Sequence, residues 1–423
     1  MLMRITVRKD YLVFPVNTRA TEKELTFSQK GKTVFTLGIR LDNVSPDFYA
    51  YIDVSLFKGD SLEISVSPEM PLFFDEADGM TIYNLYHEAV RPQAHFTVKN
   101  GYMGAPEALI RTEDGYALVY PYNPADTGKG NACRGVARSR DLIHWTEAHA
   151  PMLPEREDMI LRSAAQNEMK KLRRLYLLAE GAEIFSLTCG GKRKWISMQR
   201  DGRYLIGNRN GGVFTPEQDE KMLRYGASDC QGVTFADADR ALRIEWDSCP
   251  TASFCGQMSI PMELSLEKDE DGYRLAAMPI GELDALYKNT NLYEGLALGE
   301  KNIPLADAAH WLRMQGKILE KGVLTATLFG RELRIDFAEN RICADGAECP
   351  LSVTGGALDL ILIVDRHGVE ILADGGRIYM SCLSEEMFMD RNLLSLDLRC
   401  DEPYALDLLE IHAMESIWYE SLK

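Results

Sequence analysis

Residues 108–120, ALIRTEDGYALVY, decide the fold class of this 423-residue chain. Two short apolar runs flank Asp114 and Gly115, and an Asp-Gly turn between such runs is typical of a β-hairpin. The same pattern of strand, turn and strand predicts further strands at 175–179, 183–187 and 241–246. Successive hairpins at this spacing are typical of a β-propeller or a β-sandwich.

Strand signals continue on both sides of this region. Toward the N-terminus, half-buried strands are predicted at 33–41, 48–54 and 62–66. Beyond about residue 290, Gly-containing turns join predicted strands at 324–329, 332–337, 358–364 and 369–372. We therefore expect an all-β fold in three modules: an N-terminal β-sandwich over 1–90, a propeller over 91–270, and a C-terminal β-sandwich with its linker over 271–423.

Composition narrows the classes of partner. With 47 basic and 64 acidic residues the net charge is −17, which disfavours nucleic acid and anionic membranes but leaves neutral ligands such as sugars open. Charged residues interrupt the apolar stretch at 1–14, so no signal peptide is predicted. The nine cysteines show no CxxC spacing and indicate reduced thiols in a cytoplasmic protein. No metal or cofactor motif is present, so we expect neither group.

Ordered motifs along most of the chain resemble glycoside hydrolase family 32, the invertases, levanases and inulinases. The family's first propeller blade reads RPQFHFTP, GWMNDPNGL and LFYQYNP, and its C-terminal sandwich carries VDRSSVEVFxNDG. The corresponding stretches here are RPQAHFT at 91–97, GYMGAPEAL at 101–109, LVYPYNP at 118–124 and VDRHGVEILADG at 364–375. The resemblance implies a five-bladed type of propeller followed by a sandwich, and an accessory β domain ahead of them.

The resemblance places the family's catalytic nucleophile, the Asp of NDPNG, at Ala105. Retaining glycosidases need two carboxyl groups, one as nucleophile and one as acid/base, and a methyl group cannot attack an anomeric carbon. Neighbouring positions also depart from the family pattern, with Gly104 and Glu107 in place of Asn and Pro121 in place of Gln. Glu107 is the alternative carboxylate near this position.

Two alignments remain open for the other carboxylates. In one, Arg162 and Ser163 fit the family's FRDP motif, with Arg162 as a substrate contact, Ser163 in place of the transition-state-stabilising Asp, and the acid/base motif deleted. In the other, residues 179–187 take the place of the acid/base motif WECPDLFEL, and Glu180 is the acid/base. Tyr102, Tyr120 and Tyr122 are candidate stacking platforms for a sugar.

Chain length, like the missing nucleophile, argues against catalytic activity. Five four-stranded blades need on the order of 200 to 250 residues, and only about 175 lie between the first and last propeller motifs. We therefore expect a reduced propeller and a catalytically degenerate relative that binds carbohydrate or serves as a scaffold. An active hydrolase that uses Glu107 and Glu180, and a structural interaction protein that binds no sugar, are the alternatives.

Overall fold

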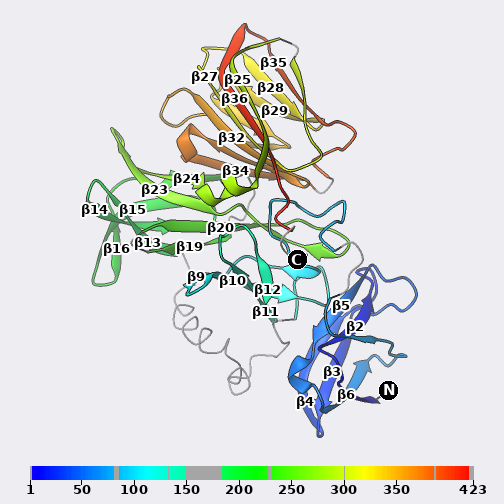
Figure 1. The fold of residues 1–423 in the computed structure, drawn as a ribbon. Helices are drawn as coiled ribbons and strands as arrows, with labels where there is room; N and C mark the ends of the chain where they lie inside the picture. Colours follow the sequence, from blue (N-terminus) through cyan, green and yellow to red (C-terminus); the bar gives the residue numbers. More distant parts are fainter. Residues whose placement is uncertain are drawn as a thin grey trace.

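The structure is a computed structural model that describes residues 2–80, 85–131, 133–148, 183–226, 231–237, 239–299, 301–384 and 387–418 (Figure 1). Strands dominate these ranges, and the described helices are short 3-10 turns at Ser55–Phe57, Gly281–Leu286 and Asp374–Gly376. The predicted all-β class is therefore confirmed. No helix in the described ranges has the length and apolar character that a membrane crossing requires.

The N-terminal module is a sandwich of two antiparallel sheets. One sheet has the order β1 (Leu2–Thr6), β6 (Ser61–Ser67), β3 (Lys23–Gln29) and β4 (Lys32–Ile39). The other has the order β5 (Phe48–Asp53), β2 (Tyr11–Val16) and β7 (Asp75–Ala77). Alternate residues of each strand, such as Leu12, Phe14 and Val16 of β2, meet in one apolar core. The strands predicted at 33–41, 48–54 and 62–66 are all present.

Three sheets follow in the described part of the propeller region, and their strands are antiparallel except for the parallel pair β21 and β8. The first contains β12 (Thr146–Ala148), β11 (Cys133–Ser139), β10 (Gly115–Asn123), β9 (Ala108–Thr112), β8 (Gly101–Met103) and β21 (Phe254–Cys255). The second contains β13 (Glu183–Cys189), β14 (Lys192–Met198), β15 (Arg203–Asn210), β16 (Val213–Pro216) and β17 (Lys221–Met222). The third contains β19 (Gly232–Ala236), β20 (Ala241–Asp247), β22 (Gln257–Met258), β23 (Met262–Asp269) and β24 (Gly272–Pro279).

The C-terminal module is a second sandwich. Its first sheet runs through β18 (Arg224–Gly226), β34 (Ile378–Leu383), β33 (Gly368–Ala373), β32 (Leu358–Asp365), β27 (His310–Gly316), β36 (Tyr404–Met414) and β25 (Tyr287–Leu298). Its second sheet runs through β26 (Lys301–Pro304), β35 (Ser395–Cys400), β28 (Val323–Leu328), β29 (Arg331–Asp336), β30 (Arg341–Ala344) and β31 (Ala347–Pro350). Because β18 lies in the propeller part of the sequence, the two modules share a sheet.

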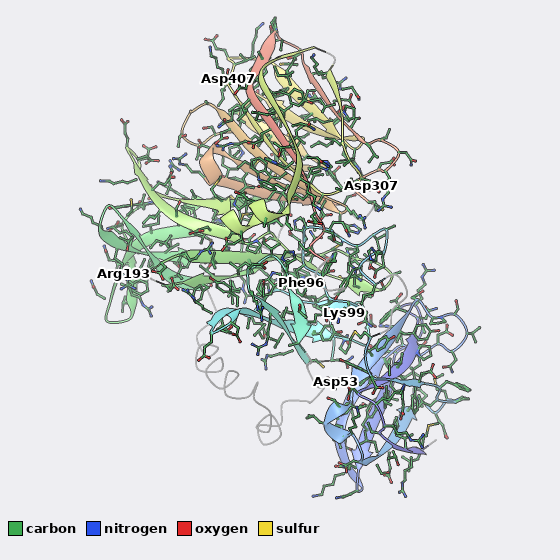
Figure 2. The ribbon with its side chains drawn as sticks, viewed as in Figure 1. Asp53, Phe96, Lys99, Arg193, Asp307 and Asp407 are labelled. Atoms are coloured by element: carbon green, nitrogen blue, oxygen red, sulfur yellow. The ribbon has the colours of Figure 1, made fainter. Side chains whose placement is uncertain are left out.

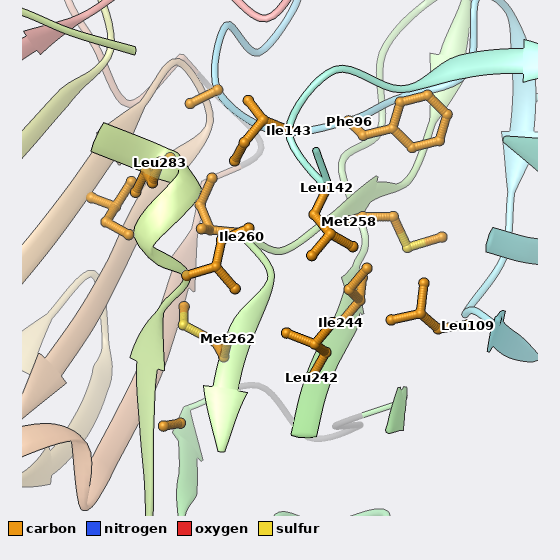
Figure 3. Packing of buried hydrophobic residues seen from close by; sticks show 14 of the residues in the cluster. Phe96, Leu109, Leu142, Ile143, Leu242, Ile244, Met258, Ile260, Met262 and Leu283 are labelled. Atoms are coloured by element: carbon orange, nitrogen blue, oxygen red, sulfur yellow. The ribbon is translucent and has the colours of Figure 1, made fainter. Parts of the chain in front are cut away.

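The propeller and the C-terminal sandwich also share one apolar core. Figure 3 shows Phe96, Leu109 and Leu142 of the first propeller region beside Leu242, Ile244 and Met258 of the third sheet. Trp311, Ile361 and Ile363 of the sandwich belong to the same cluster. The expected boundary at residue 270 falls in the turn between β23 and β24, which pair over their whole length. The division into 1–90, 91–270 and 271–423 stays a proposal.

Side-chain hydrogen bonds connect the N-terminal sandwich to the first propeller sheet. Asn131 exchanges two bonds of 2.7 and 2.8 Å with the backbone of Gly38. The guanidinium of Arg40 donates to Asp126 at 2.7 Å. Figure 2 shows Asp53 of the sandwich and Lys99 of the propeller region at this junction. Both residues line a small, partly open cavity of about 70 Å³ between the two modules.

Candidate functional site

The backbone around Ala105 is fixed by the first propeller sheet. Strand β8 pairs with β10 on one side and with β21 on the other. The N–H groups of Gly104 and Glu107 donate to the carbonyls of Pro121 and Val119 at 2.8 and 2.7 Å. Ala105 lies half-buried between these two bonds. The position that the resemblance assigns to the nucleophile is thus held in place by strand pairing and carries only a methyl group.

Two further departures from the family pattern pack against each other. A Cβ atom built on Gly104 would lie 3.0 Å from Cβ of Pro121 and 3.3 Å from Cε1 of Tyr102. Contacts this short require the neighbours to move, so the Pro121 ring occupies the space next to residue 104. A side chain added at residue 104 would therefore crowd the Pro121 ring.

The Glu107 carboxylate is engaged by a neighbouring strand. Nε of Arg134, on β11, donates to Oε2 of Glu107 at 3.0 Å, and both side chains are partly exposed. The position of Glu107 as an alternative nucleophile stays a prediction. In this geometry its carboxylate is oriented by a surface ion pair.

The three candidate stacking tyrosines have different environments. Tyr120 is 1% exposed and packs edge-on against Phe96 and Tyr122, and its role as a sugar platform stays a prediction. Tyr102 is 7% exposed and packs edge-on against Trp246, with ring centroids 6.2 Å apart. Burial raises the pKa of all three phenols. Tyr122 is half-buried, and its hydroxyl lies 3.3 Å from Oδ1 of Asn100.

Three of the predicted site residues lie outside the described ranges. These are Arg162, Ser163 and Glu180, the residues on which the two alignments differ. Their roles as a substrate contact, a degenerate stabiliser position and an acid/base stay predictions. Among the residues that the structure describes, no group of three or more His, Cys, Asp or Glu side chains could hold a metal ion.

A buried ion pair joins the first propeller motif to the C-terminal sandwich. Asp365, at the end of β32, accepts hydrogen bonds from the N–H groups of Gln93, Ala94 and Arg366 and lies 2.9 Å from Nδ1 of His95. Burial alone would lower the pKa of His95, but the Asp365 and Glu370 carboxylates raise it to about 10. Burial alone would raise the pKa of Asp365, but His95 and the backbone donors lower it to about 2.

A second buried network surrounds Arg224 of β18. Its guanidinium donates to Glu245 at 2.6 Å and to Asp247 at 3.3 Å, and lies 4.6 Å from the centre of the Tyr379 ring. Ser381 of the sandwich donates to Asp247 at 2.8 Å. Burial raises the pKa of Asp247, whereas the arginines reverse the effect of burial at Glu245 and lower its pKa. These charged side chains lie in the core that the propeller and the C-terminal sandwich share, and they connect residues of both modules.

The family motifs in the sequence did not predict these two buried ion-pair networks. Asp365 and His95 stand in motifs that match the family, but nothing local to either motif says that they touch. The charges at Arg243, Glu245 and Asp247 alternate with apolar residues along β20, a pattern that predicts one exposed face. Both faces are buried, because the partners of these charges come from other strands.

The described chain is a propeller region packed on a β-sandwich, and the motif around residue 105 is half-buried in the first propeller sheet. Residues 95–162 match the family profile described as Glycosyl hydrolases family 32 N-terminal domain. The levanase of Bacillus sp. (strain L7) is 25% identical over 57% of this chain and 32% of the levanase. The matched stretch covers a third or less of the length of curated relatives such as this levanase.

Solved structures match over the fold. Exo-inulinase from Aspergillus awamori superimposes with a TM-score of 0.64 at 14% identity and covers 79% of this chain and 100% of its own. A β-fructofuranosidase from Schwanniomyces occidentalis, complexed with fructosyl-erythritol, gives 0.61 at 15% identity over 77% and 98%. A family 32 structure from Bifidobacterium adolescentis gives 0.59 at 13% identity over 99% and 100%. The family profile over residues 95–162, the levanase and the solved structures together support a relationship to glycoside hydrolase family 32.

Proposed function

We propose that this chain is a member of family 32 that binds fructose-containing carbohydrate without hydrolysing it. The observation that carries the proposal is Ala105 at the position of the family's nucleophile. The double displacement of retaining glycosidases requires two carboxyl groups about 5 to 5.5 Å apart. At residue 105 the covalent glycosyl intermediate has no atom on which to form.

The surroundings of Ala105 support this proposal. The Pro121 ring lies against residue 104, where glycine leaves room for it, so the surroundings of Ala105 depart from the family pattern at more than one position. The nearby carboxylate of Glu107 lies 3.0 Å from Nε of Arg134. A nucleophile that relocated to Glu107 would first have to break this pair.

Carbohydrate is the ligand class because of the relatives and because of charge. The Schwanniomyces occidentalis enzyme was solved with a fructosyl ligand, which makes fructose-containing sugars the first ligands to test. A net charge of −17 disfavours anionic ligands, whereas a neutral sugar incurs no such repulsion. Binding without turnover is consistent with a family fold that has lost its nucleophile.

Isothermal titration calorimetry tests the binding part of the proposal. The full chain is titrated with sucrose and with short fructo-oligosaccharides of the inulin and levan linkages, and with maltotriose as a fructose-free control. We expect heat from at least one fructose-containing sugar, with a dissociation constant between about 1 μM and 1 mM, and none from maltotriose. Absence of heat with every sugar would contradict the proposal and favour a structural interaction protein.

A further inference from the structure

The N-terminal sandwich has an open groove on its outer face. The groove has a volume of about 600 Å³, within the range of ordinary ligand sites. Strand alternation creates it, because Leu12, Phe14 and Val16 point into the core and leave Pro15 on the opposite face of β2. Pro15 stands directly across from Tyr49 of β5, and both residues line the groove.

Large apolar side chains are exposed in this groove. Tyr49 is 51% exposed, Phe73 60% and Val44 92%. Phe73 is turned outward while its neighbours Leu72 and Phe74 pack against the core of the module. Exposed apolar side chains that gather in a concave site are typical of a binding surface. Two aromatic rings there offer flat faces of the kind that pack against the C–H face of a sugar ring.

Polar groups of the groove suit hydroxyl groups. Asn43 contributes an amide whose nitrogen donates to the carbonyl of Pro71 at 3.5 Å. Asp75 contributes a carboxylate and is the single charged residue among the lining residues. A carboxylate and an amide can accept hydrogen bonds from neighbouring hydroxyls, which sugars present in pairs.

The negative charge of the groove and of the whole chain indicates which class of ligand can occupy the groove. A phosphorylated or acidic ligand would be repelled by Asp75 and by the net charge of −17. A second copy of the chain, docked face to face, would bring two Asp75 carboxylates together and carries the same net charge. A neutral oligosaccharide avoids both costs and uses the aromatic faces and the polar groups together.

Hydrogen bonds also connect the groove to the first propeller sheet. The Asn100 side chain donates to the carbonyl of Tyr49 at 2.8 Å, and the Tyr122 hydroxyl lies 3.3 Å from the other end of the same amide. This chain of contacts fixes the backbone of Tyr49 relative to the first propeller sheet. We infer that the groove lined by Tyr49 and Phe73 is a binding site for a neutral, fructose-containing oligosaccharide, an inference that rests on the proposed function.

Three variants of the full chain test this site. Tyr49→Ala and Phe73→Ala each remove one exposed ring, and Leu292→Ala removes an apolar side chain of similar exposure, 56%, from the edge strand β25. Each protein is titrated with the fructo-oligosaccharide that binds the wild-type chain best. We expect each aromatic variant to weaken binding about tenfold or more, and Leu292→Ala to bind as the wild type does.

The outcomes separate this inference from the proposed function. If the wild-type chain binds sugar and both aromatic variants bind equally well, the groove is not the site, while carbohydrate binding stands. If the wild-type chain binds no sugar, the proposed function fails and the groove assignment fails with it. If light scattering finds that the wild-type chain is a dimer and the Tyr49→Ala variant is a monomer, the groove is an interface between copies and the inference is overturned. All three substitutions are at exposed side chains, and far-UV circular dichroism confirms that each variant is folded.

Discussion

The Asp365→Ala protein is expected to lose about 3 to 5 kcal/mol of unfolding free energy, because the substitution leaves a buried positive charge without its partner. His95 would keep only the Glu370 carboxylate, 3.4 Å from its Nε2 atom. The backbone N–H groups of Gln93 and Ala94 would also lose their acceptor in the core. Urea unfolding followed by tryptophan fluorescence measures this loss.

Asp359→Ala is the matched control, because Asp359 lies on the same strand and its carboxylate also has a cationic side-chain partner, Arg313. Its pair with Arg313 has two bonds, of 2.8 and 3.0 Å, and is partly exposed. An exposed ion pair contributes about 1 kcal/mol or less. Equal losses in the two variants would show that Asp365 does not hold the modules together as described.

The pH profile gives this prediction a second readout. The folded-state pKa of His95 is raised from 6.5 to about 10, so its contribution is complete below pH 6.5 and is lost as pH rises toward 10. The folded-state pKa of Asp365 is lowered from 3.8 to about 2, so its contribution is complete above pH 3.8 and is lost as pH falls toward 2. In Asp365→Ala the alkaline loss should shrink, and an unchanged profile would argue against the pair.

Replacing Arg224 with methionine is the second substitution with a large expected effect, again about 3 to 5 kcal/mol. Arg224 is 2% exposed and is a partner of both Glu245 and Asp247. After its removal Glu245 retains Arg243 and Asp247 retains Ser381, but the net buried charge becomes negative. Methionine preserves most of the volume, so the loss measures the charge and its hydrogen bonds.

Arg203→Met provides the control for this substitution. Arg203 pairs with Asp201 and Glu220, but its side chain is more than half exposed. Its removal should change the urea unfolding midpoint little, because solvent screens an exposed ion pair. A cost for Arg224→Met as small as that for Arg203→Met would mean that water or a rearranged Arg243 replaces the lost guanidinium.

Local signals made most of the fold predictable from sequence. The hairpin at 108–120 forms as β9 and β10 because the Asp-Gly turn and its flanking apolar runs act over a few residues. The same is true of the N-terminal strands and of the hairpin formed by β32 and β33. Motif resemblance then identified the family, since ordered motifs persist where overall identity is low.

Long-range contacts limited what could be predicted about the site. His95 and Asp365 are 270 positions apart, so only the packing of the sandwich on the propeller brings them together. Tyr120 carries a motif position expected to face a sugar, yet its ring is in the core, with the Gly135 backbone against it. Local alternation also could not reveal that Glu245 and Asp247 meet an arginine from another strand.

Release of fructose is the most direct test of the claim that the chain does not hydrolyse fructosidic bonds. The full chain is incubated with sucrose, inulin and levan, and free fructose is followed over hours beside an active family member. We expect no release above the protein-free control, and none from Ala105→Asp, because the Pro121 ring still stands where the family pattern has Gln. Turnover of the wild-type chain at about 1 to 1,000 per second, the range of ordinary enzymes, would contradict the account.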